Sequence, residues 1–371
     1  MTGSEGDELA LARASGVLTD PESLGSPVVA VVGATGLVGQ EMLRVLDERD
    51  FPMAGLKLFA SERSRGRPIE FRGKTYEVDV LSEESFRGID LVLMEVESPI
   101  SREWAPVAAE AGATVIDNSS AWRMEEGIPL VVAEVNPEDL QGHRGIIANP
   151  NCTTMTLMPV LAPLHREFGV RRAVITSLQS VSGTGQAALR ELEKQALRFL
   201  DRPSGLRRAG VDGGYEAGEI YPKPIAFNVI PQCDDFADEV RTKEEVKLVA
   251  ETHKILNDDS IGVIATCVRV PVEVGHSLSV VVEFNRPVHV EEALDVLADS
   301  PGVDLFVGSE YPTPLDVAGT DDVCVGRIRP DTSSEGGLAI WVCGDNLRKG
   351  AALNCVQIAE VLLDQGWLKP S

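Results

Sequence analysis

One cysteine of the chain lies where a thiolate could form and react. The stretch Asn149-Pro150-Asn151-Cys152-Thr153-Thr154 combines turn residues with the start of an expected helix. At or beside a helix N-cap, unpaired backbone N–H groups and the helix dipole stabilise a thiolate and lower the pKa of the thiol. Cys152 is therefore a candidate nucleophile, with an inert buried thiol as the alternative.

A thiolate nucleophile needs a partner that moves protons near neutral pH, and histidine is the first candidate. Of the five histidines, His276 stands between Gly275 and Ser277, at the expected mouth of a hairpin that carries Val270 and Val280. A side chain at that place can face a cleft. The spacing favours His276 over the other four histidines, though only slightly.

Four charged residues could bind an anionic or zwitterionic ligand. Glu244 and Lys247 lie three residues apart on an expected helix that begins at Thr242, and by themselves they predict a solvent-exposed ion pair. Arg269 lies in an apolar strand, where its charge must meet either a buried carboxylate or a ligand anion. Arg123 follows a strand end, on the side where doubly wound sheets bind ligands, and is a candidate anion clamp.

The elements that must position these residues begin with a strand, a glycine turn and a helix. Residues 27–32 form a β-branched run, residues 33–39 read Gly-Ala-Thr-Gly-Leu-Val-Gly, and residues 41–46 have helical spacing. This is the opening unit of a doubly wound sheet, whose turn amides and positive helix end can hold a pyrophosphate. A tight turn without a ligand is the alternative, because the spacing is G-x-x-G-x-x-G.

The next strand, residues 56–60, ends in Ser61-Glu62-Arg63-Ser64-Arg65. An acid near this point usually holds the ribose 2′-hydroxyl of NAD, whereas an arginine can hold the 2′-phosphate of NADP. Arg63 and Ser64 therefore favour NADP, while Glu62 points the other way. The alternative is that all three are solvated loop residues.

The remaining pattern predicts two domains. Strands expected at residues 91–94, 114–116, 130–132 and 145–148 alternate with helices such as residues 101–111, which indicates a parallel sheet. Longer alternating strands at 172–179, 266–272 and 277–284 indicate an antiparallel or mixed sheet. The expected class is α/β, with a doubly wound, Rossmann-like cofactor domain at 28–150 and 350–371 and an α+β catalytic domain with a mixed sheet at 151–349. The last helix, residues 349–363, should pack back on the first domain.

Composition excludes several classes of protein. The 371 residues include 34 Lys and Arg against 58 Asp and Glu, a net charge of −24, so nucleic acid and anionic membranes are unsuitable partners. No apolar run reaches the ~18 residues of a membrane span. Six scattered cysteines and five histidines lack metal-binding spacing, so we expect no metal and reduced thiols in a cytoplasmic protein. Residues 1–27 are expected to form an acidic, solvated extension with a short helix at 8–14.

Taken together, these segments resemble the aspartate-semialdehyde dehydrogenase family, from about Val28 to the C-terminal helix. The likeness is carried by residues 29–39, 117–120, 149–154, 179–183, 225–231 and 345–352. It implies a homodimer built through the sheet of the second domain, which is then a dimerisation domain as well. It also implies an NADP-dependent, reversible conversion of L-aspartate 4-semialdehyde plus inorganic phosphate into L-4-aspartyl phosphate, within lysine, threonine and methionine biosynthesis.

The resemblance implies the reaction roles residue by residue. Cys152 is similar to the family's nucleophile, which forms a thiohemiacetal and then a thioester, and His276 is similar to its acid/base. Gln179 is similar to the residue that orients the substrate and the acyl intermediate.

It also implies the binding residues. Arg269 and Glu244 match the groups that hold the carboxylate and the amino group of the substrate. Arg123 and Lys247 match the phosphate clamp. The positions that match the NADP contacts are Gly33, Thr35, Gly36, Leu37, Val38, Arg63, Ser64, Ser182, Gly183 and Asn346.

One stretch departs from the family pattern. After residues 91–94 the family usually carries small residues, whereas this chain has Glu95-Val96-Glu97. Two carboxylates there should weaken binding of a polyanionic cofactor unless they turn away or pair with a cation.

Two alternative functions remain. The first is a relative of N-acetyl-glutamyl-phosphate reductase, but Glu244 argues against it because a carboxylate suits a free ammonium group. The second is a catalytically silent nucleotide-binding relative, which Glu95 and Glu97 would allow.

Overall fold

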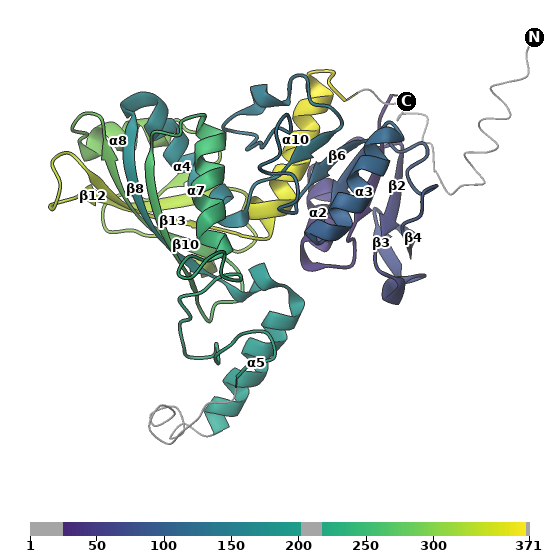
Figure 1. Ribbon diagram of the computed structural model, residues 1–371, viewed down its shortest axis with the longest axis horizontal. Coiled ribbons are helices and arrows are strands. Elements are labelled where there is room, and N and C mark those ends of the chain that lie inside the picture. The colour runs from purple at the N-terminus through teal and green to yellow at the C-terminus, as the bar shows by residue number, and fades with distance from the viewer. Residues whose placement is uncertain (1–24, 202–216, 369–371) are drawn as a thin grey trace, which may run out of the picture. The chain divides into compact units, whose positions relative to one another are not determined.

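A computed structural model describes residues 25–201 and 217–368 of the chain, and these form two compact units. Unit 1 takes the residues up to Ala133, Pro137–Asn149 and those from Ala352 onward, and unit 2 takes Glu134–Asn136 and Pro150–Ala351. The expected helix at residues 8–14 and most of the expected acidic extension lie outside the described residues. Figure 1 shows the elements of both units, coloured along the chain.

Unit 1 is built on a sheet whose described strands follow the order β3-β4-β2-β1-β5-β6-β7. All its neighbouring strands are parallel except β3 and β4, which confirms the predicted doubly wound architecture. Its strands are β1 (Val28–Val32), β2 (Gly55–Phe59), β3 (Pro68–Phe71), β4 (Lys74–Asp79), β5 (Leu91–Met94), β6 (Thr114–Asp117) and β7 (Ile146–Ala148). Its helices are α2 (Leu37–Glu48), α3 (Ser98–Glu110) and α10 (Leu353–Asp364), with short 3₁₀ turns η2 (Glu62–Ser64) and η3 (Pro137–Leu140).

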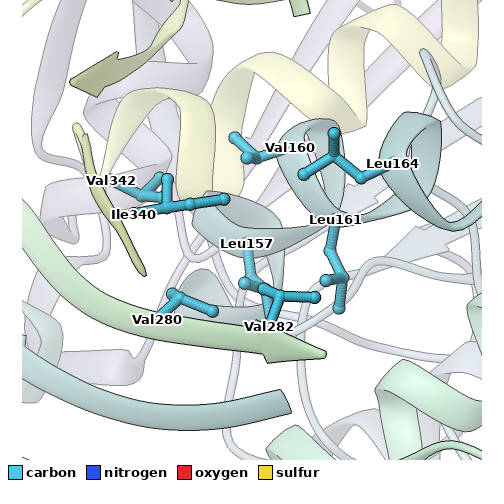
Figure 2. A pocket seen from close by; sticks show the side chains of 8 residues that line it. All are labelled: Leu157, Val160, Leu161, Leu164, Val280, Val282, Ile340 and Val342. Carbon is cyan, nitrogen blue, oxygen red and sulfur yellow. The ribbon is translucent and has the colours of Figure 1, made fainter. Parts of the chain in front are cut away.

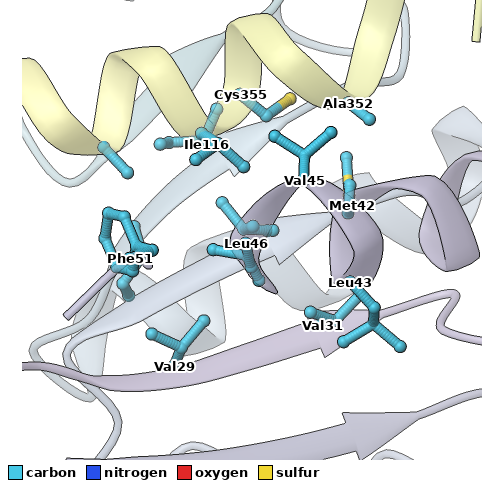
Figure 3. Close-up of a cluster of buried hydrophobic side chains, with 14 of the residues drawn as sticks. Val29, Val31, Met42, Leu43, Val45, Leu46, Phe51, Ile116, Ala352 and Cys355 are labelled. Carbon is cyan, nitrogen blue, oxygen red and sulfur yellow. The ribbon is translucent and has the colours of Figure 1, made fainter. Parts of the chain in front are cut away.

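Alternate residues of the central strand β1 face opposite layers of helices. Val29 and Val31 lie in one buried cluster with residues of α2 and α10, whereas Ala30 and Val32 lie in another with residues of α3. Figure 3 shows the first cluster, with Cys355 of α10 directed at the side chains of α2. The prediction that the last helix packs on the first domain is therefore confirmed.

The prediction of a strand at residues 130–132 is wrong. Leu130 makes only an isolated parallel bridge with Ala148. The side chain of Asn354 takes the place of a further strand, because its Nδ2 donates to the carbonyl of Val131 at 2.8 Å and its Oδ1 accepts from the amide of Ala133 at 2.9 Å. A side-chain amide thus satisfies the backbone groups that a ladder would have used.

Unit 2 is built on a mixed sheet whose described strands follow the order β11-β12-β13-β10-β8-β9, which confirms the predicted sheet type. Its strands are β8 (Val170–Gln179), β9 (Gly262–Arg269), β10 (His276–Phe284), β11 (Val303–Leu305), β12 (Val323–Pro330) and β13 (Leu338–Gly344). Its helices are α4 (Cys152–Phe168), α5 (Gln186–Asp201), α7 (Lys243–Leu256), α8 (Val290–Ala298) and α9 (Pro314–Val317). Two short turns complete it: the 3₁₀ turn η4 (Val181–Thr184) and the π-helical turn η5 (Arg348–Ala352), which leads into α10.

The apolar face of α4 packs on the centre of this sheet. Figure 2 shows Leu157 and Leu161 of α4 against Val280 and Val282 of β10, around a small apolar pocket. Because α4 begins at Cys152, this packing fixes the axis on which the cysteine is mounted.

The prediction that His276 lies in a hairpin with the preceding strand is wrong. β8 lies between β9 and β10, antiparallel to β10 and parallel to β9. The strand predicted at 266–272 also begins and ends earlier, as β9. The segment that links β9 to β10 therefore crosses β8 and brings His276 over the end of that strand, next to Gln179 and Ser180.

No helix within residues 25–201 and 217–368 is both long enough and apolar enough to cross a membrane.

Candidate active site

Cys152 is the first residue of helix α4. Asn151 is its N-cap, and the side chain of Asn151 accepts a hydrogen bond from the amide of Thr153 at 2.8 Å. The predicted turn and helix start are confirmed, and the sulfur stands where the helix dipole favours negative charge. Gly350 makes room for the cysteine, because a Cβ at position 350 would lie 3.0 Å from the Cβ of Cys152.

His276 contacts the sulfur of Cys152. Its Nε2 lies 3.3 Å from Sγ of Cys152, and its side chain is fully buried. Burial, with a further contribution from the Arg269 cation, holds the pKa of His276 well below its usual value of 6.5. The imidazole is therefore neutral at pH 7 and able to accept a proton.

Glu244 lies beneath the cysteine turn and is buried. The predicted ion pair with Lys247 is present, but the prediction that it is solvent-exposed is wrong. Its carboxylate accepts from Asn151 Nδ2, Thr153 Oγ1 and Gln179 Nε2, each at 3.2 Å. The predicted capping box at Thr242 is present, and the helix that it starts packs on β9 with Glu244 facing inward. One helical turn on, Lys247 Nζ lies 3.6 Å from Glu244 and 2.6 Å from a carboxylate oxygen of Asp234.

Arg269 is a buried cation at the end of β9. Its Nη1 donates to the carbonyl of Ser180 at 2.6 Å, while its Nε is buried without a hydrogen-bond partner among the described residues. Gly183 lies against it, because a Cβ there would be 3.2 Å from Nη1 of Arg269 and 3.4 Å from the ring of His276. Of the two partners predicted for Arg269, this geometry favours a ligand anion.

The sequence alone did not indicate three residues that support this site. Thr153 accepts from Gln179 Nε2 at 2.7 Å, and Glu251 accepts from the amide of Asn151 at 2.7 Å. Ser180 contacts the ring of His276. Glu251 could have been predicted from its spacing. It lies seven residues after Glu244 on one helix, which places both carboxylates on the same face.

Ser182 and Asn346, matched above to cofactor contacts, also lie in unit 2. Both are buried, and Asn346 Nδ2 donates to Ser182 Oγ at 3.0 Å. Unit 2 therefore brings together Cys152, His276, Gln179, Glu244, Arg269, Ser182, Gly183 and Asn346.

In unit 1 the glycine turn has the backbone that a pyrophosphate cradle requires. Gly33 has φ +91°, and a Cβ there would lie 1.9 Å from the carbonyl oxygen of Glu95. A Cβ at Gly39 would lie 2.2 Å from the carbonyl oxygen of Gly33. Both positions therefore require glycine. Gly36 caps α2 without a side-chain hydrogen bond, so the first amides of α2 are not satisfied by their cap. The turn, which includes Thr35, Leu37 and Val38, therefore fits a dinucleotide phosphate.

The loop after β2 lies beside this turn. Ser64 Oγ is 3.3 Å from Thr35 Oγ1, and Glu62 is paired with Arg65 at 2.8 Å. Arg63 is exposed and forms no ion pair within the described part of the chain. The loop therefore presents both an acid and an arginine near the glycine turn.

Arg123 is buried in unit 1 against two asparagine backbones. Its Nε donates to the carbonyl of Asn149 at 2.9 Å and its Nη2 to the carbonyl of Asn118 at 2.8 Å. Asn149 Nδ2 in turn donates to Asn118 Oδ1 at 2.6 Å. Arg123 thus belongs to unit 1, whereas Lys247, the other predicted phosphate ligand, belongs to unit 2.

Comparisons with known proteins agree with this architecture. Residues 28–143 match the family model "Semialdehyde dehydrogenase, NAD binding domain", and residues 161–349 match "Semialdehyde dehydrogenase, dimerisation domain". An aspartate-semialdehyde dehydrogenase from Aquifex aeolicus is 46% identical over 344 residues, which cover 91% of this chain and 98% of that relative.

Two solved structures extend the comparison. The crystal structure of aspartate semialdehyde dehydrogenase II from Vibrio cholerae, complexed with ASA, has a TM-score of 0.86 at 45% identity and covers 91% of this chain and 98% of its own. The Candida albicans enzyme, solved with NADP, has a TM-score of 0.70 at 25% identity and covers 92% and 99%. With this likeness over nine-tenths of its length, the chain belongs to the aspartate-semialdehyde dehydrogenase family.

Proposed function

We propose that the chain catalyses the NADP-dependent, reversible conversion of L-aspartate 4-semialdehyde and phosphate into L-4-aspartyl phosphate, in lysine, threonine and methionine biosynthesis. Residues 28–150 and 350–371 would bind the cofactor, and residues 151–349 would carry the catalytic groups. The observation that supports this most directly is the 3.3 Å contact between Cys152 Sγ and His276 Nε2 at the N-terminus of a helix. A nucleophile beside a neutral base is the arrangement that thioester chemistry requires.

Substrate recognition is assigned to two buried charges. The substrate carries a carboxylate and an ammonium group at one end and the aldehyde at the other. Arg269 offers its unpartnered Nε to the carboxylate, and Glu244 offers a carboxylate to the ammonium group. Gln179 bonds both Glu244 and Thr153, so its amide is oriented beside the cysteine turn, where it can direct the carbonyl of the substrate.

Cys152 and His276 perform the covalent steps. The thiol proton passes to Nε2 of His276, the thiolate adds to the aldehyde carbon, and the proton returns to the oxygen to give a thiohemiacetal. His276 then takes the hydroxyl proton while the carbon loses hydride, which leaves a thioester on Cys152. Bound NADP supplies the hydride acceptor for this oxidation, and NADPH the donor in the reverse direction.

Phosphate completes the cycle. A phosphate oxygen attacks the thioester carbon, the carbon–sulfur bond breaks, and Cys152 leaves as a thiolate. We assign the phosphate to Arg123 and Lys247, whose cationic groups suit a dianion. In the biosynthetic direction every step runs backwards, from aspartyl phosphate to the semialdehyde.

The test is an assay of NADP reduction with aspartate semialdehyde, with and without phosphate. We expect reduction to depend on phosphate, and we expect N-acetyl-glutamate semialdehyde to react poorly because its acylated nitrogen cannot pair with Glu244. Equal rates with both aldehydes would contradict the assigned substrate, and no reduction by either would favour a silent relative.

A homodimer is the proposed assembly, formed through the sheet of the second domain. The match to a dimerisation domain supports it. So do large apolar side chains that unit 2 leaves exposed, among them Leu197 and Leu200 of α5 and Ile264 of the outer strand β9. Sedimentation velocity would measure the mass directly.

Replacing Arg63 by alanine should weaken the binding of NADP by about 10-fold to 100-fold, because a charged hydrogen bond to the 2′-phosphate is lost. NAD, which lacks that phosphate, should bind with nearly unchanged Kd. Calorimetric titrations of both cofactors against the wild type and the variant measure this. Arg65→Ala is the matched control, since Arg65 is engaged with Glu62. Equal losses for NADP and NAD would defeat the assignment of Arg63.

Glu95 should make cofactor binding depend on pH. Its carboxylate turns toward Asn118 Nδ2, which donates to it, and burial raises its pKa to about 7. The carboxyl is therefore neutral below pH 7 and negative above it, beside the glycine turn through Gly33. In the wild type the Kd of NADP should rise between pH 6 and pH 8.5, because the added charge repels the phosphates. We expect this rise to be about 3-fold to 10-fold larger than the rise in the Glu95→Gln variant.

The comparison of variant with wild type cancels the titration of the cofactor phosphates themselves. Glu97→Gln is the control, because Glu97 is an exposed acid two residues away. Parallel Kd profiles for the wild type and Glu95→Gln would show that the carboxyl of Glu95 does not act on the cofactor.

A further inference from the structure

The ring of His276 is held at both nitrogens. Nε2 faces the sulfur of Cys152, and Nδ1 lies 3.1 Å from the hydroxyl oxygen of Ser180 and 3.2 Å from the backbone amide of the same residue. Ser180 is fully buried at the end of β8. A single residue therefore offers two different partners to one ring nitrogen.

These two partners favour different positions for the ring proton. The amide can only donate, so it favours the neutral ring with the proton on Nε2, which cannot accept another proton there. The hydroxyl oxygen can accept from Nδ1–H, which leaves the lone pair of Nε2 directed at Cys152. Only the second form can act as the base for the thiol.

Asn346 commits the hydroxyl to the accepting role. Ser180 Oγ donates to Asn346 Oδ1 at 2.8 Å, and an amide oxygen has no hydrogen to give back. The same Oδ1 accepts from the amide of Gly275 at 2.8 Å and from Ser182 Oγ at 3.2 Å, so the side-chain amide of Asn346 is held in one orientation. The hydrogen of Ser180 is thereby occupied, and its lone pairs remain for the ring.

We infer that Ser180 and Asn346 are positioning residues that keep the proton of His276 on Nδ1, so that Nε2 can take the proton of Cys152. In that step the S–H bond breaks, an Nε2–H bond forms, the sulfur becomes a thiolate and the ring becomes an imidazolium whose Nδ1–H is accepted by Ser180. A third group that orients the base is a general feature of activated nucleophiles. Here a serine held by an asparagine fills that place. The inference rests on the proposed roles of Cys152 and His276.

The test follows the alkylation of Cys152 by iodoacetamide between pH 5.5 and pH 9.5, in the full chain without substrate or cofactor. In Ser180→Ala the hydroxyl partner of Nδ1 is lost and the amide of residue 180 remains. We expect its alkylation profile to move to higher pH, with a rate at pH 7 about tenfold below the wild type, the usual effect of one neutral hydrogen bond. Ser180→Thr keeps a hydroxyl and should restore the wild-type profile.

Two further variants separate this role from general damage. Ser277→Ala removes another buried hydroxyl, one that lies by Cys343 and not by the ring, and should keep the wild-type profile. Asn346→Ala should shift the profile in the same direction as Ser180→Ala, and the double variant should shift it no further, because the two residues act in series.

A Ser180→Ala profile that superimposes on the wild type would overturn the inference while leaving Cys152 and His276 in their proposed roles. An additive double variant would overturn the role of Asn346. If Cys152 in the wild type reacts no faster at pH 7 than a simple thiol, and His276→Asn leaves that rate unchanged, the proposed nucleophile itself fails.

Discussion

Replacing Cys152 by alanine should lower kcat by at least about 10,000-fold, because loss of a covalent nucleophile leaves only binding and orientation. The cofactor should bind with unchanged Kd, since Cys152 is not among the residues matched to cofactor contacts. Steady-state NADP reduction and a calorimetric cofactor titration measure the two quantities on the same preparation.

The other thiols of the chain make this prediction specific. All six cysteines are unbridged, and Cys152 is half-buried whereas the other five are buried. Burial raises the pKa of Cys324 to about 12 and that of Cys343 to about 11, so these thiols are protonated at neutral pH. Cys324→Ala should therefore retain wild-type kcat. Near-normal turnover by Cys152→Ala would remove the covalent mechanism altogether.

Replacing His276 by asparagine should lower the rate of hydride transfer by about 100-fold to 10,000-fold, the usual contribution of a general base. The substrate KM should change little, because Arg269 and Glu244 remain. Rapid-mixing measurement of a single turnover isolates this step from product release. An unchanged single-turnover rate would exclude His276 as the proton acceptor.

The pH dependence gives this prediction a second readout. The pKa of His276 lies well below 6.5, so the base is deprotonated at neutral pH and is lost only when the pH falls through that lowered pKa. In the oxidative direction the wild type should show an acid limb below pH 6.5, and His276→Asn should lack it. His289→Asn is the control, because His289 is the N-cap of helix α8 and asparagine is itself a good N-cap.

The strands and the glycine turn of unit 1 could be predicted because their signals are local. A continuous apolar run marks a strand buried on both faces, and glycines at fixed spacing mark a turn where other side chains would collide. The start of α4 at Cys152 could also be predicted, since turn residues followed by an apolar run are typical of a helix N-terminus. The segment predicted as a strand at 130–132 makes only one bridge, to Ala148, and other backbone groups there bond the side chain of Asn354, more than two hundred residues away in sequence.

The candidate site also has features that could be predicted from the sequence and features that could not. The amino-acid sequence by itself predicted a candidate nucleophile at the start of a helix, and the glycine turn. The tertiary structure alone decided that β8 separates β9 from β10, that Glu244 is buried beneath the cysteine turn, and that Ser180, which is bonded to Asn346, contacts the ring of His276. The physical reason is that helix capping and strand burial depend on neighbours along the chain, whereas desolvation and hydrogen bonding of a charged group depend on whatever residues the fold brings against it.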